Sequence, residues 1–103
     1  MTLLEATFVA LADLHLQPGR RLELEEAARQ ANALLREQPG CLGARLLHFS
    51  GGPYLYRYEI DWRSREDWQR FWESPAYPAL RATLDPWTAQ PFVVQLHDVK
   101  VSG

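Results

Sequence analysis

The chain has 103 residues, a formal net charge of −2 and a hydrophobic content of 47%. This length and composition are typical of one globular domain, which we expect over residues 1–103. Acidic and basic residues are scattered along the sequence, without the basic stripe that could neutralise a run of phosphates. We therefore expect no nucleic-acid partner.

A single cysteine, Cys41, excludes an internal disulfide and removes the usual paired-cysteine zinc and redox motifs. A lone thiol fits a reducing compartment, which favours a cytoplasmic location. The apolar run Phe8–Leu14 contains Asp13 and follows Glu5, so it resembles neither a secretory signal nor a membrane span. We expect no membrane partner.

The first two elements have clear periodicity. Residues Thr7–Leu16 alternate between a wholly apolar set and a mixed set, which predicts a strand with one dry face. The stretch Arg21–Gln38 repeats apolar residues at helical spacing and is followed by Pro39-Gly40. This pattern predicts an amphipathic helix.

Two further runs rich in strand-forming residues, Ala44–Ser50 and Tyr54–Trp62, are separated by two glycines and a proline. That composition predicts a hairpin. In the second run one face is aromatic or aliphatic, and it carries Tyr54, Tyr56, Tyr58, Ile60 and Trp62. The other face is largely charged, and it carries Leu55, Arg57, Glu59 and Asp61.

Ser64, followed three residues later by Asp67, resembles a capping box and predicts the start of a helix that Ser74-Pro75 interrupts. A second helical piece runs to about Leu84. We expect the inner faces of the two pieces to carry Trp68, Phe71, Trp72, Tyr77, Leu80 and Leu84. The run Phe92–Val101 then predicts a last strand.

This order of elements, βαββαβ, predicts an α+β, ferredoxin-like fold with a four-stranded antiparallel sheet and helices on one side. The other side of the sheet would be uncovered. We expect a second copy of the chain to pack against it sheet to sheet, which gives a homodimer.

Several motifs, taken together and in this order, resemble the antibiotic biosynthesis monooxygenase family of dimeric α+β barrels. The motifs are Pro18-Gly19, Gln38-Pro39-Gly40-Cys41-Leu42, Trp62, Ser64-Arg65-Glu66-Asp67-Trp68 and Ser74-Pro75-Ala76-Tyr77. The resemblance extends over nearly the whole chain. It implies a pocket between the sheet and the helices of each protomer.

The resemblance also implies candidate activities. The family includes cofactor-free oxygenases of polycyclic phenols or quinols, in which a strand-three tryptophan and an asparagine four residues before it stand beside the substrate. Trp62 matches that tryptophan, whereas Tyr58 occupies the asparagine position. The haem-degrading branch uses a first-strand asparagine and a histidine on the helix after strand three, and this sequence has neither. Gly51-Gly52 lacks the pattern of a phosphate loop, so we expect no cofactor.

The aromatic stripe is a candidate wall for a small aromatic ligand. Its candidate substrate-binding residues are Trp62, Tyr58, Tyr56, Trp72 and Tyr77. In the alternative interpretation, the same side chains are the protein core or the dimer seam.

Three histidines, His15, His48 and His97, lie on predicted strands. Their spacing forms no metal-ligand pattern, so we predict no metal site. His15 and His48 are candidate bases that would deprotonate a phenol, and the alternative is that they are ordinary strand residues. Two functions stay open: a cofactor-independent monooxygenase of a small aromatic phenol or quinol, and a noncatalytic dimeric module that binds an apolar ligand or serves as an interaction domain.

Overall fold

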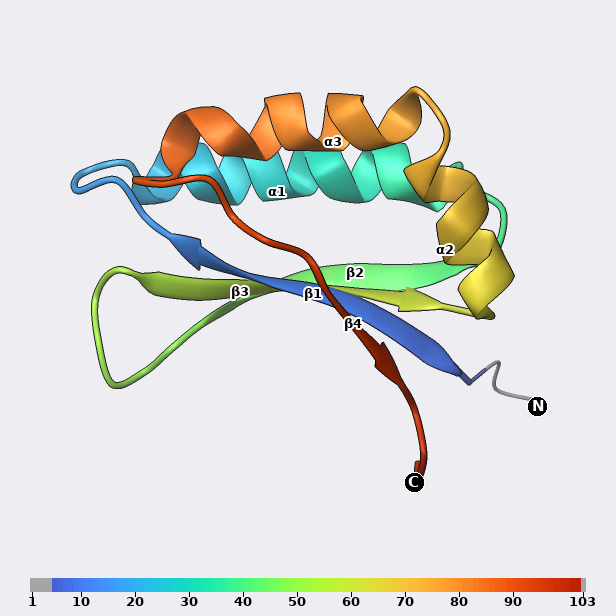
Figure 1. Cartoon of the computed structure of the whole chain (residues 1–103). Helices are drawn as coiled ribbons and strands as arrows, with labels where there is room; N and C mark the ends of the chain where they lie inside the picture. The colour runs from blue at the N-terminus through green and yellow to red at the C-terminus, as the bar shows by residue number, and fades with distance from the viewer. Residues whose placement is uncertain (1–4, 103) are drawn as a thin grey trace.

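The computed structural model describes residues 5–102 and contains one antiparallel sheet with the helices on a single face of it (Figure 1). The elements in chain order are β1 (Phe8–His15), α1 (Arg21–Arg36), β2 (Cys41–His48), β3 (Leu55–Trp62), α2 (Arg65–Trp72), α3 (Ala76–Leu84), the 3-10 helix η1 (Asp85–Trp87) and β4 (Gln95–Asp98). The spatial order of strands is β2-β3-β1-β4. The predicted ferredoxin-like α+β fold is confirmed.

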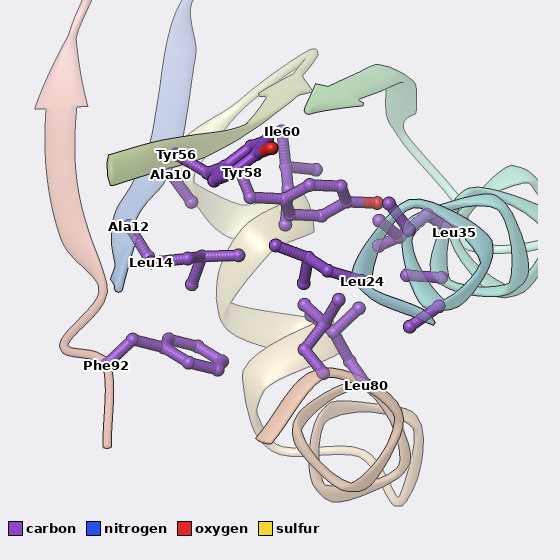
Figure 2. Packing of buried hydrophobic residues seen from close by; sticks show 14 of the residues in the cluster. Ala10, Ala12, Leu14, Leu24, Leu35, Tyr56, Tyr58, Ile60, Leu80 and Phe92 are labelled. Carbon is purple, nitrogen blue, oxygen red and sulfur yellow. The ribbon is translucent and has the colours of Figure 1, made fainter. Parts of the chain in front are cut away.

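The register of the two central strands decides which side chains enter the core. β1 and β3 pair from Phe8 opposite Trp62 to His15 opposite Leu55. Even-numbered residues of both strands are buried beneath the helices, because successive strand residues point to opposite faces. They meet the buried face of α1, which carries Leu24, Ala27, Ala28, Ala31 and Leu35 (Figure 2).

The outer face of the sheet carries the charged row that the sequence predicts on β3. Arg57 lies 3.0 Å from Asp13 on β1, and Arg45 of β2 lies 3.0 Å from Glu59. These cross-strand pairs hold opposite charges in register. Within residues 5–102, no helix combines the length and apolarity that crossing a membrane requires.

Some predicted boundaries are wrong. β2 begins at Cys41, three residues early, because an irregularity between Cys41 and Gly43 lets the strand pair with Trp62. Tyr54 lies outside β3 and is 51% exposed, so it does not belong to the aromatic face. β4 is only four residues long. The residues before it leave the sheet and contact the helix layer instead, as the red segment of Figure 1 shows.

The start of α2 is organised around the buried carboxylate of Asp67. Ser64 is the N-cap, and its hydroxyl accepts a hydrogen bond from the Asp67 main-chain N–H while donating one to the Asp67 carboxylate. Arg63 and Arg70 also donate to that carboxylate. The hydrogen bond from Arg63 is the main cause that lowers the pKa of Asp67, and Ser64 adds to it.

Gly40 packs directly over this carboxylate. Its φ of +80° lies in the left-handed region, and a Cβ placed there would be 2.2 Å from Cγ of Asp67. Both the backbone conformation and the close approach require glycine. The Gly40 carbonyl also accepts a 2.8 Å hydrogen bond from the Arg63 N–H. The turn before β2 and the first turn of α2 are thereby joined beside Trp62.

Candidate ligand pocket between the sheet and the helices

A small apolar cavity lies between the sheet and the helices. Its walls come from β1, β3, α2, α3 and the segment before β4, and they include Tyr58, Trp68, Tyr77 and Phe92. The volume open to the centre of a water molecule is about 10 Å³. A space of this size is at the limit for one water, so a polycyclic ligand needs the walls to move apart.

An aromatic cluster forms one end of this cavity. The rings of Trp62 and Trp68 meet edge to face with centroids 5.8 Å apart, and Trp68 meets Tyr77 in the same way at 6.0 Å. Phe71 lies 5.3 Å from Trp62 and 5.9 Å from Tyr77. These edge-to-face and tilted contacts stabilise the cluster. Trp68 and Tyr77 line the cavity, and Trp62 lies behind Trp68.

Trp62 contributes a buried donor to this cluster. The residue is fully buried, and its indole N–H has no hydrogen-bond partner among the described residues. An unpaired buried donor destabilises a protein by roughly 1–3 kcal/mol. A ligand oxygen that accepted from this N–H would remove the penalty. Trp62 does not line the cavity itself, so its contact with a ligand stays a prediction.

Tyr58 crosses the core from β3 to α1. Its ring lines the cavity, and its hydroxyl donates a 2.5 Å hydrogen bond to Oδ1 of Asn32. Burial raises the pKa of the Tyr58 phenol, and the neighbouring Cys41 adds to this shift. Tyr58 therefore stays protonated at neutral pH and acts as a donor rather than a base.

Asn32 and Trp68 are site residues that the sequence interpretation missed. Asn32 is a polar residue on the apolar face of α1, one turn after Ala28 and three residues before Leu35, both of which are buried. A single amide among apolar side chains needs a hydrogen-bond partner in the core, and this is the sequence feature that indicates a polar contact at Asn32. The sequence predicts Trp68 only as a packing residue on the inner face of its helix, because sequence alone does not show where the cavity lies.

Trp72 is not on the inner face of α2, so that prediction is wrong. It is 47% exposed and packs on Tyr77 with ring centroids 4.5 Å apart. With Trp68, Gln69, Val94 and Leu96 it lines an open groove of about 250 Å³ between α2 and β4. Trp68 and Val94 also line the cavity, so the groove lies against its outer wall.

The remaining predicted residues lie away from the cavity. Tyr56 is buried and its ring packs against that of His48 at 4.6 Å, near the β2–β3 hairpin. His15 pairs with Leu55 on the outer face of the sheet. Both histidines are exposed, and neither lines the cavity. Their role as bases stays a prediction. Among residues 5–102, no three His, Cys, Asp or Glu side chains are grouped as a metal site would require.

The fold and the buried aromatic pocket define a ferredoxin-like α+β protein with its candidate site between sheet and helices. The sequence model of the family described as "Antibiotic biosynthesis monooxygenase" matches residues 7–83. The chain therefore belongs to the antibiotic biosynthesis monooxygenase family.

Solved structures share this fold. A Bordetella bronchiseptica protein carrying the same family name is 23% identical, with a TM-score of 0.82 over 94% of this chain and 100% of that one. A Caulobacter crescentus protein of the same family name is 20% identical, with a TM-score of 0.78 over 95% and 93% of the two chains. A mutant of SnoaB, a cofactor-independent oxygenase from Streptomyces nogalater, is 18% identical, with a TM-score of 0.77 over 94% and 97%. No curated protein matches the sequence significantly.

Proposed function

We propose that this protein is a cofactor-independent monooxygenase that oxidises a small aromatic phenol or quinol with dioxygen. The observation that carries the proposal is the unpaired, fully buried N–H of Trp62 within the aromatic cluster beside an apolar cavity. An aromatic ring fits such walls, and its oxygen could accept from the indole. The fold shared with SnoaB, a cofactor-independent oxygenase, supports the same activity.

The reaction needs only the substrate and dioxygen. A phenolate passes one electron to dioxygen, the resulting radical and superoxide combine at the ring, and loss of water leaves a quinone. One phenol and one dioxygen thus give one quinone and one water. The protein contributes a dry, aromatic site that positions the ring and excludes solvent from the radical pair.

Each site residue has a part in this scheme. Trp68 and Tyr77 line the cavity and pack on the ring. Trp62 lies behind Trp68 and donates to the substrate oxygen once the walls have moved apart to admit the ligand. Tyr58 is held by Asn32 at the far wall of the cavity and positions the bound ring. His15 and His48 stay the candidate bases, and because both are exposed and lie outside the cavity lining, either would take the phenol proton before the ring enters the cavity.

Oxygen uptake with a panel of anaerobically prepared quinols and polycyclic phenols tests the proposal. We expect uptake above autoxidation that survives metal removal and falls by about tenfold or more in Trp62→Phe, which loses one hydrogen bond to substrate. Trp87→Phe is the matched control, because Trp87 lies in η1 against α1 and does not line the cavity. If no compound reacts faster with the protein than without it, the proposal is wrong for those substrates.

The second candidate is a noncatalytic dimeric module that binds a small apolar ligand or serves as an interaction domain. The small free volume of the cavity favours it, because the closed form has no room for a polycyclic phenol. Binding of panel compounds without oxygen uptake would support this module instead.

We also propose that the chain forms a homodimer through the outer face of the sheet. That face combines aliphatic residues, such as Val9, Leu11 and Leu55, with the charge pairs of Arg57 and Arg45. Light scattering at micromolar concentration tests this, and a monomeric mass would contradict it.

A further inference from the structure

The segment of residues 91–94 forms a wall of the cavity without belonging to any helix or strand. β1 pairs with β4 only from Phe8 to Leu11, and residues 91–94, which come before Gln95 of β4, are not paired in the sheet. Phe92 is buried and lines the cavity, Val93 is exposed, and Val94 lines the cavity again. Figure 2 shows Phe92 extending from this segment toward α3, on the side where Leu80 lies.

Arg81 of α3 connects this segment to the helix layer. Arg81 of α3 donates a 2.8 Å hydrogen bond to the Phe92 carbonyl, and its guanidinium carbon lies 3.9 Å from the centre of the Phe92 ring. The same guanidinium donates to the Tyr77 hydroxyl at 3.2 Å and lies 3.5 Å from Asp85. Arg81 thus connects both cavity-lining rings, Phe92 and Tyr77, to α3. The charge-assisted hydrogen bond and the cation–π contact both stabilise the position of Phe92 against α3.

The cavity is also too small for a ligand while this segment is in place. The other walls are paired strands and packed helices, which open only with the core. Segments with few ladder hydrogen bonds open locally at lower free energy than strands do. The outer groove beneath Trp72 and Leu96 lies against Val94 and leads to this wall.

We propose that residues 91–94 are a lid over the ligand cavity and that Arg81 is the latch that holds the lid closed. Opening detaches the Phe92 carbonyl and ring from the guanidinium and swings Phe92 and Val94 away from β1. A small aromatic ligand then enters from the groove between α2 and β4. The inference rests on the proposed function, because it takes this cavity as the ligand site.

Thiol labelling measures the opening without any substrate. In a Cys41→Ser background, Ala12→Cys places a buried reporter in the cavity wall, and Ala31→Cys places one in the α1 core, outside the cavity lining. Labelling of either buried thiol by a disulfide reagent reports how often it becomes exposed.

Each reporter is compared with and without Arg81→Met, which keeps an unbranched side chain and removes the guanidinium. We expect Arg81→Met to raise the labelling rate at Ala12→Cys by about tenfold or more, as expected for losing a charge-assisted hydrogen bond, and to leave Ala31→Cys within about twofold. Arg29→Met, on an exposed arginine paired with Glu26, is the matched control and should change neither rate.

The proposal is overturned if the two reporters accelerate together, because Arg81 then stabilises the whole fold, or if neither accelerates. Since no turnover is measured, this test is separate from oxygen uptake. Selective opening without oxidation of any phenol would keep the lid and reject the monooxygenase, and the reverse pair of results would reject the lid alone.

Discussion

Replacing Gly40 by alanine should destabilise the fold far more than the same change at Gly19. Both glycines have φ near +80°, so each alanine pays the left-handed backbone penalty of about 1–2 kcal/mol. At Gly19 a Cβ meets nothing within 4 Å, whereas at Gly40 it would lie 2.2 Å from Cγ of Asp67. The carboxylate must move, and losing one of its charge-assisted hydrogen bonds adds about 2 kcal/mol.

We therefore expect Gly40→Ala to lower the free energy of unfolding by about 3–4 kcal/mol and Gly19→Ala by about 1–2 kcal/mol. Urea titration followed by tryptophan fluorescence measures both values with one method. The difference between the two variants isolates the contact with Asp67, because the backbone penalty is common to them. Equal losses in the two variants would refute the reasoning, since they would leave no role for the close approach.

Other variants test the packing and the polar contacts. The pKa of Asp67 is lower in the folded state, so the ionised carboxylate stabilises the fold fully above about pH 4, and this stabilisation disappears as the pH falls through the folded pKa. Asp67→Asn should therefore weaken the fall in unfolding free energy at acid pH. An unchanged fall in the variant would contradict this. Tyr58→Phe leaves the Asn32 amide oxygen without its donor and should reduce the free energy of unfolding by about 1–2 kcal/mol in urea titrations. A loss near zero would show that this hydrogen bond does not stabilise the fold. Trp68→Ala, which removes a buried ring, should reduce the unfolding free energy by about 3–5 kcal/mol. Trp72→Ala, on the exposed groove, should reduce it by less than about 2 kcal/mol. The reverse ranking would show that the two faces of α2 are misassigned.

The predicted elements with strong periodicity agree with the structure. β1 and α1 begin within one residue of their predicted starts, because alternation and helical spacing are local properties of the sequence. Ser64 caps α2 as its spacing to Asp67 indicates, since a cap depends on residues within one turn. Errors occurred where distant contacts decide the outcome. β4 is shorter than its β-branched composition suggests, because Phe92 bonds to Arg81 on α3 instead of continuing along β1.

By itself, the sequence determined the order of elements, the aromatic face of β3 and the motifs that indicate the family. Only the tertiary structure decided which of those aromatic residues surround a cavity. Tyr58 meets Asn32, Trp68 separates Trp62 from the free space, and the two candidate histidines lie outside its lining. These relations join residues far apart in the sequence, and side-chain volume and packing set them. No local pattern carries that information.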